Sequence, residues 1–68
     1  MGFNLRNAIL ANVKGSSEQD VEATITDAIN SGEEKMLPGL GVLMEIYWKT
    51  ANEQQKDQLC QQISQGLR

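Results

Sequence analysis

The chain has no histidine and only one cysteine, Cys60, and both shortages exclude kinds of chemistry. Histidine is the commonest general base and metal ligand, so acid–base and metal sites lack their usual residue. A single thiol cannot form an intramolecular disulfide or a zinc site of the usual kind, and no histidine is present to activate it as a nucleophile. The sequence therefore predicts no catalytic residues, no metal site and no cofactor, and we expect a protein that is not an enzyme.

Long apolar runs are also missing. The most apolar stretch, residues 37–48, is shorter than the roughly 20 residues of a membrane span, and it contains Glu45. The first residues lack the long apolar core of a signal peptide. An unpaired thiol in so small a chain is typical of a reducing compartment. We therefore expect a cytoplasmic protein with no membrane partner.

Basic residues are few and scattered. The net charge is −3, and the six lysines and arginines are Arg6, Lys14, Lys35, Lys49, Lys56 and Arg68. Nucleic-acid binding usually needs a basic stripe, because neutralisation of phosphates supplies most of the affinity. This pattern disfavours nucleic acid as a partner. The alternative is a nucleic-acid-associated protein in which folding gathers Arg6, Lys14, Lys49 and Lys56.

Helical spacing is the main pattern that is present. Apolar residues recur every three or four positions in four segments, and no strand alternation is visible. Residues that favour helix N-caps precede three of the segments: Asn4, Ser17 and Asn52. Gln55 is spaced to complete a capping box with Asn52, and Gly15 and Gly32 stand where helices would end. The predicted fold is all-α, a compact bundle of about four short helices. The single domain covers residues 1–68, with helices at 4–13, 17–31, 38–51 and 53–66.

The third segment is apolar at nearly every position from Val42 to Trp48 except Glu45. A helix of this kind is usually central, and its apolar residues could face both its own domain and a second subunit. Because a chain of 68 residues has a thin margin of stability and no disulfide, we predict a homodimer. Large aromatics dominate cores and interfaces alike, so Tyr47 and Trp48 fit either place. The candidate interface residues are Leu40, Val42, Ile46, Tyr47 and Trp48.

Three further features could suggest chemistry, and a structural interpretation is favoured for each. Cys60 falls on the apolar side of the last helix, which predicts a buried, inert thiol. Glu33 and Glu34 could bind a cation, but solvated acids in a first helical turn are favoured, because no loop of alternating oxygen ligands surrounds them. Residues 38–41, PGLG, could present backbone N–H groups to an anion. They lack the lysine and hydroxyl of a phosphate loop, so close packing or a tight turn at the glycines is favoured.

Two blocks of sequence carry a family resemblance. Residues 4–13, NLRNAILANV, and 23–42, ATITDAINSGEEKMLPGLGV, closely resemble the small acid-soluble spore protein I family of spore-forming Gram-positive bacteria. The most specific part is SGEEKMLPGLGVL at 31–43. MEIYWKTA at 44–51 also looks like the family, and the similarity fades along the glutamine-rich last helix.

The resemblance implies a minor small acid-soluble spore protein that is made in the developing forespore, held in the spore core and lost after germination. It implies no enzyme and brings no established site residues. Major spore proteins of the alpha/beta type coat DNA, but this sequence does not resemble theirs. We therefore predict a non-enzymatic protein that acts by binding or structural packing during sporulation and dormancy. A small enzyme or ligand carrier would need an enclosed polar pocket, which these residue types do not suggest.

Overall fold

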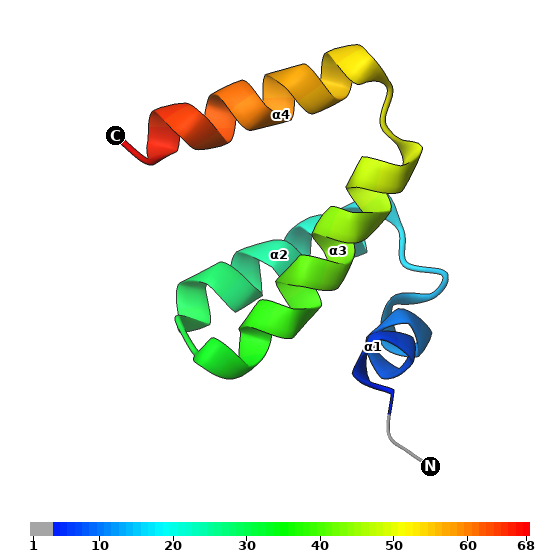
Figure 1. The fold of residues 1–68 in the computed structure, drawn as a ribbon. Helices are drawn as coiled ribbons and strands as arrows, with labels where there is room; N and C mark the ends of the chain where they lie inside the picture. Colours follow the sequence, from blue (N-terminus) through cyan, green and yellow to red (C-terminus); the bar gives the residue numbers. More distant parts are fainter. Residues whose placement is uncertain (1–3) are drawn as a thin grey trace.

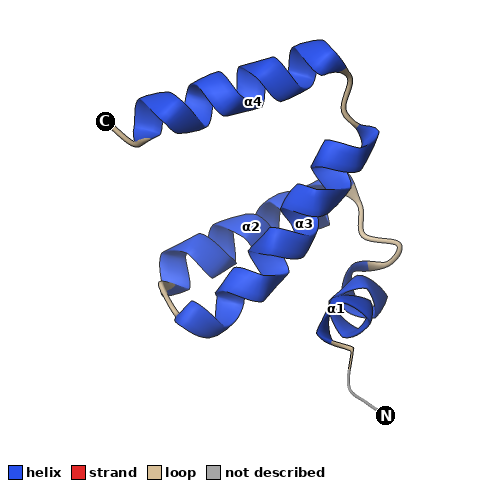
Figure 2. Ribbon diagram, in the orientation of Figure 1, coloured by secondary structure: helices blue, strands red, loops and turns tan. Residues whose placement is uncertain are grey.

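A computed structural model describes residues 4–68, so the first three residues of the predicted domain lie outside it. Over this range the chain forms four α-helices joined by short loops, and no strand occurs there (Figure 2). The helices are α1 (Leu5–Val13), α2 (Glu18–Ser31), α3 (Leu37–Thr50) and α4 (Glu53–Gly66), with a short 3₁₀ helix, η1 (Glu34–Met36), before α3. The predicted all-α class with four short helices is confirmed.

The predicted N-caps of α1 and α2 are confirmed in atomic detail. The side chain of Asn4 accepts a hydrogen bond from the backbone N–H of Asn7 at 3.1 Å. Ser17 and Asp20 form a reciprocal capping box, with N···O distances of 3.1 and 3.4 Å. Gly32 then ends α2 with φ at +65°, a left-handed conformation that a glycine adopts without steric cost. Local sequence signals therefore determine where these two helices begin and where α2 ends.

The start of α3 differs from the prediction. The helix begins at Leu37 rather than Pro38, because η1 leads directly into it, and Pro38 lies in the first turn, where its missing N–H is not needed. Gly39 and Gly41 lack positive φ angles, and a Cβ atom added to either would meet nothing within 4 Å. The predicted tight turn or close packing at these glycines was therefore wrong.

α3 is the helix around which the others are arranged (Figure 1). It contacts α1, η1 and α2, and α2 and α3 lie side by side. α4 leaves the end of α3 at a sharp corner and makes few contacts with the rest of the chain (Figure 1). None of the helices over residues 4–68 is long and apolar enough to cross a membrane.

Little of the chain is buried. Among the described residues only Ala28 on α2 and Val42 on α3 are buried, with 8 % and 7 % of their surface exposed. The prediction of a nearly all-apolar, interior third helix was therefore wrong, since α3 is exposed around much of its circumference. Its large exposed apolar residues are Leu37, Met44, Ile46, Tyr47 and Trp48. α1, η1 and α2 cover only part of α3, and α4 folds back over the α2–α3 pair with few contacts to it (Figure 1).

Candidate interaction surface

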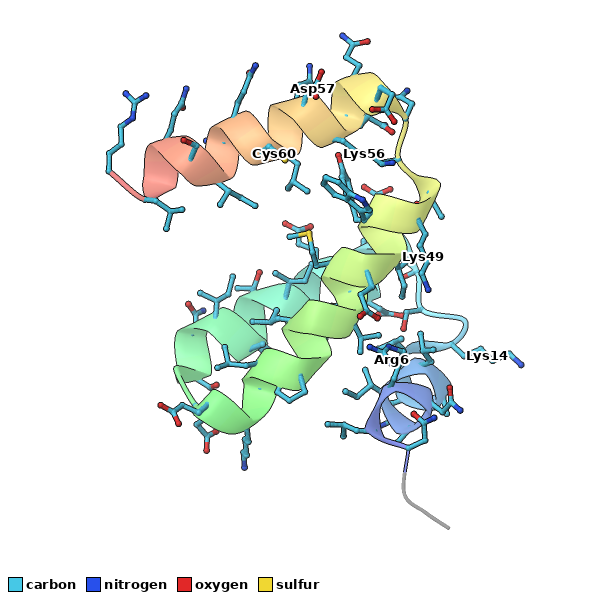
Figure 3. The ribbon with its side chains drawn as sticks, in the orientation of Figure 1. Arg6, Lys14, Lys49, Lys56, Asp57 and Cys60 are labelled. Atoms are coloured by element: carbon cyan, nitrogen blue, oxygen red, sulfur yellow. The ribbon has the colours of Figure 1, made fainter. Side chains whose placement is uncertain are left out.

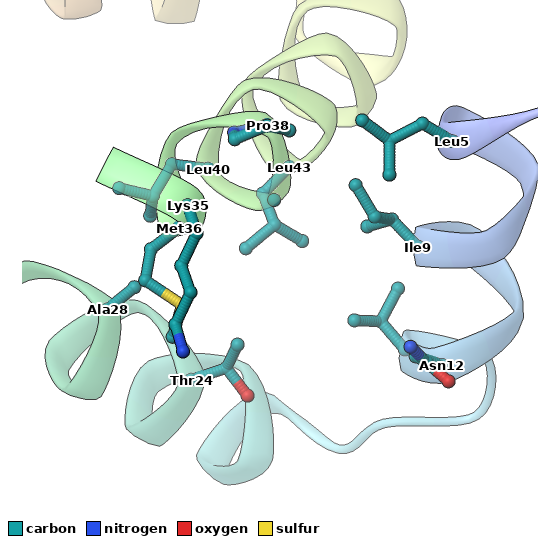
Figure 4. A pocket seen from close by; sticks show the side chains of 12 residues that line it. Leu5, Ile9, Asn12, Thr24, Ala28, Lys35, Met36, Pro38, Leu40 and Leu43 are labelled. Carbon is teal, nitrogen blue, oxygen red and sulfur yellow. The ribbon is translucent and has the colours of Figure 1, made fainter. Parts of the chain in front are cut away.

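The first apolar groove lies between α1, α2 and α3 and has a volume of about 520 Å³. We call it the α1 groove. Leu5 and Ile9 on α1 face Leu43 on α3 across it, and Ala28 of α2 lies on the opposite wall (Figure 4). Two of the longest apolar side chains on α1 thus line an open groove instead of packing fully against α2.

A second groove, of about 580 Å³, lies between the α2–α3 pair and α4, and we call it the α4 groove. Val21 and Ile25 contribute from α2, Leu43 and Tyr47 from α3, and Leu59 from α4. The described side chains that line it are apolar or uncharged. This chemistry suits an apolar partner surface and offers no charged group to recognise an ionic ligand.

The structure separates the five predicted interface residues into three places. Leu40, Ile46 and Tyr47 all line the α4 groove, and the last two are each 40 % exposed. Val42 points the other way, into the contact with α1, where it is buried within this chain. Trp48 is 44 % exposed at the corner between α3 and α4. A second subunit could therefore reach four of the five without any rearrangement of the chain.

The α4 groove also contains residues that the sequence prediction missed. Val21, Ile25 and Leu59 each belong to an apolar stripe that helical spacing reveals. Spacing shows that a residue faces one side of its own helix, but it does not show which helix lies opposite. The signal that α2 and α4 would share a groove was therefore not present in the local pattern.

The corner between α3 and α4 is held by several local interactions. Asn52 and Gln55 form the predicted capping box, with N···O distances of 2.8 and 2.9 Å. The Tyr47 hydroxyl donates to the backbone oxygen of Gln55 at 3.4 Å. Lys56 Nζ lies 5.2 Å from the centroid of the Trp48 ring, within the range of a cation–π interaction. These contacts fix the direction in which α4 leaves α3.

One bidentate ion pair joins α1 to α3. Arg6 donates from Nε to Glu45 Oε1 at 2.8 Å and from Nη2 to Oε2 at 2.9 Å. The hydrogen bonds from Arg6 lower the pKa of Glu45, as do the positive charges of Arg6 and Lys49, while partial desolvation opposes them. The same hydrogen bonds raise the pKa of Arg6. Because both groups remain largely in contact with water, we expect the pair to orient α1 more than to stabilise it.

This ion pair predicts a specific dependence of stability on pH. The folded-state pKa of Glu45 is lowered, so its contribution is present above the ordinary carboxyl range and is lost as the pH falls through the folded-state value. We expect the difference in unfolding free energy between the wild type and Glu45→Gln to shrink towards zero on acidification from neutral pH to below about pH 4. Urea titrations at several pH values measure it. Glu22→Gln, on the exposed face of α2, is the control, and a wild-type advantage that is unchanged in acid would contradict the prediction.

The four cations of the nucleic-acid alternative do not form one free basic surface. Arg6 is paired with Glu45, and Lys56 lies over Trp48 and 3.6 Å from Glu53. Lys14 follows the end of α1, whereas Lys49 lies near the α3–α4 corner (Figure 3). Two of these four side chains, Arg6 and Lys56, therefore already interact with other residues of the chain.

Cys60 is exposed, so the predicted buried thiol was wrong. Cys60 is three residues before Ile63 and seven before Leu67, so it lies beside them on the same side of α4. Ile63 and Leu67 are exposed as well, because the rest of the chain makes few contacts with this part of α4. Over residues 4–68, no group of three or more potential metal ligands lies close enough together to hold a metal ion, and Glu33 instead lies 3.5 Å from Lys35.

The fold and its grooves define a class: a small all-helical protein whose apolar side chains line open grooves instead of one closed core. Comparison with known proteins identifies the family. The family model described as "Small, acid-soluble spore protein I" matches residues 3–67, and the chain belongs to this family. The match continues through the glutamine-rich α4, further than the sequence blocks alone indicate.

Several family members are similar over nearly their whole length. A protein named small, acid-soluble spore protein I from Halalkalibacterium halodurans is 79 % identical, with 98 % of both chains covered. The protein of that name from Shouchella clausii is 73 % identical, covering 98 % of this chain and 97 % of its own. One from Bacillus cereus is 57 % identical, covering all of this chain and 99 % of its own. No solved structure matches the chain.

Proposed function

We propose that this member of the small acid-soluble spore protein I family acts in the spore core by non-catalytic packing, as a homodimer. The observation that carries the proposal is the open apolar surface of α3 at the α4 groove, where Met44, Ile46 and Tyr47 are each at least 40 % exposed. Exposed apolar side chains that lie together on one surface favour association with another surface. The family name supports the link to spores, and fractionation of purified spores checks the location in the core.

A non-catalytic role is supported by the chemistry of the side chains. The chain has no histidine, the commonest general base, and its single thiol is exposed. The α1 and α4 grooves are lined mainly by aliphatic residues, which can exclude water and provide contact area. Such surfaces favour binding of another apolar surface over acid–base chemistry.

Sedimentation equilibrium over a micromolar concentration range tests the homodimer. We expect the wild type to sediment as a dimer and Ile46→Glu to shift the population towards monomer, because each dimer would bury two charged side chains in its interface. Ile46 is exposed in the single chain, so the variant should keep its helical circular dichroism. Thr26→Glu, on the exposed side of α2, is the matched control and should remain dimeric.

Trp48, the only tryptophan, reports on the same equilibrium. Its fluorescence emission should move to longer wavelength as dilution dissociates the dimer and returns the side chain to water. A wild type that is monomeric at every concentration, with constant emission, would disprove the homodimer.

A further inference from the structure

The chain exposes more surface than a typical folded monomer of the same mass. Its accessible surface is 5694 Å² for 7.5 kDa, whereas a folded monomer of that mass exposes about 4,250 Å². The radius of gyration is 13.4 Å, where about 11 Å is typical of a domain with 68 residues. The surplus of about 1,400 Å² exceeds the roughly 800 Å² per partner that a standard stable interface buries. A second copy of the chain could therefore cover it in a dimer.

The apolar face of α4 contributes to this exposed surface. Leu59, Ile63 and Leu67 are four residues apart and share one face of the helix. Leu59 is half-buried at the α4 groove, but Ile63 is 44 % exposed and Leu67 80 % exposed. A helix of 14 residues is marginal in water without packing, however well it is capped. The apolar face of α4 therefore needs a surface that its own chain does not supply.

A surface of matching chemistry lies along α2 and α3. The α4 groove is walled by apolar residues of both helices, including Ile25 and Leu40. Ile29, one turn beyond Ile25 on α2, is 63 % exposed and lengthens this apolar line. Ile25 and Ile29 on α2 and Ile63 and Leu67 on α4 are all apolar, and the one charged residue on this face of α4, Lys56, already lies over Trp48. The two surfaces are thus complementary without any ion pairing.

The corner between α3 and α4 opposes the closure of α4 onto its own chain. Moving α4 down onto its own α2 would require the Tyr47–Gln55 hydrogen bond and the cation–π contact of Lys56 with Trp48 to break. The reciprocal capping box of Asn52 and Gln55 keeps the start of α4 at Glu53, so the connection to α3 stays short. A second chain can bring its α4 to the groove with both corners intact.

We infer that two chains exchange their α4 helices, with Ile63 and Leu67 of each chain packing on the α2–α3 side of the other. The inference rests on the proposed homodimer and specifies its arrangement. A two-fold axis makes both contacts identical, so the groove of each chain is filled by the apolar face of the partner's α4. The exposed side of α3 lies beside the same contact, because Ile46 and Tyr47 also line the α4 groove.

Charge on α4 tests the exchange. Ile63→Glu should raise the dimer dissociation constant roughly a hundredfold or more, because each dimer loses two buried isoleucines. Gln65→Glu adds the same charge about 200° away around the helix and should leave the dissociation constant unchanged within about threefold. Sedimentation equilibrium measures both variants, and circular dichroism checks that each keeps its helices.

A disulfide test identifies which chain supplies α4. In a Cys60→Ser background, Ile29→Cys on α2 combined with Ile63→Cys on α4 should form an interchain disulfide on mild oxidation, seen as a dimer on a non-reducing gel. The control combines Ile29→Cys with Gln65→Cys and should give far less dimer, because residue 65 faces away from the apolar side of α4.

The outcomes separate the exchange from the dimer itself. An intrachain disulfide, which leaves a monomer on the gel, would show that α4 closes on its own chain and would overturn the exchange. A dimer that survives Ile63→Glu and forms no crosslink would keep the homodimer but overturn the exchange. A monomeric wild type would overturn both.

Discussion

Val42→Asn is expected to lower the free energy of unfolding by about 3 kcal/mol, which is most of what a chain of this size has. Val42 is one of two described residues that are almost fully buried, and it lies where α1 packs on α3. The substitution removes an apolar side chain of similar size and places an amide where it must leave water. It adds no charge that Arg6 could pair with, so the neighbouring ion pair does not rescue it.

Urea unfolding followed by circular dichroism at one fixed protein concentration measures the effect, because a dimer's apparent stability depends on concentration. The matched control is Thr26→Asn. Threonine and valine are both β-branched and have similar helix propensity, but Thr26 is exposed on α2, so its unfolding free energy should change by less than about 0.5 kcal/mol. Equal effects at the two positions would show that the contact between α1 and α3 does not hold the fold together.

Val42→Ala separates the loss of apolar contact from the cost of burying an amide. It removes apolar contact without adding a polar group, so we expect about half the loss seen with asparagine. The cavity should cost little extra, because the site borders an open groove and can relax.

The helix starts were predictable because their causes are local. An N-cap such as Ser17 bonds to a backbone group three residues away, so the signal and its effect lie within one turn. The same applies to the Asn52–Gln55 capping box, which is recognisable from two residue types and their spacing. The all-α class follows from the same short-range evidence.

The candidate interaction surface was only partly predictable, because it depends on how helices are placed relative to one another. Val42 and Ile46 are one turn apart on α3, and spacing alone assigns them to the same face. In the structure Val42 packs against α1 and Ile46 stays exposed, because α1 is short and covers only part of that face. Cys60 shows the same limit, since its exposure follows from the direction of α4 and not from its own helix.

The family resemblance reached further than the residue pattern did. The periodicity of apolar residues predicts an all-helical chain but no function. The sequence blocks at 4–13 and 23–42 indicate the family whose model matches residues 3–67. Family membership, in turn, does not describe the grooves. The geometry of α3 and α4 supplies the evidence for a surface that binds a second chain.

The two glycines of α3 give the second large prediction, and its sign is stabilising. Gly39 and Gly41 lie in a regular helix, and a Cβ atom at either position would meet nothing within 4 Å. Glycine costs a helix roughly 0.5–1 kcal/mol relative to alanine, so Gly39→Ala with Gly41→Ala should raise the unfolding free energy by about 1 kcal/mol or slightly more. Urea titration measures the gain at fixed protein concentration.

Gly32→Ala is the matched control and should act in the opposite direction. Gly32 has φ at +65°, where a Cβ atom is strained by about 1–2 kcal/mol even though no neighbour obstructs it. The same chemical change should therefore stabilise the chain at 39 and 41 and destabilise it at 32. A loss of stability from the α3 double variant would contradict the open space seen around these glycines in the single chain. If that loss appeared only at dimer-forming concentrations, it would place the start of α3 inside the interface with the second copy.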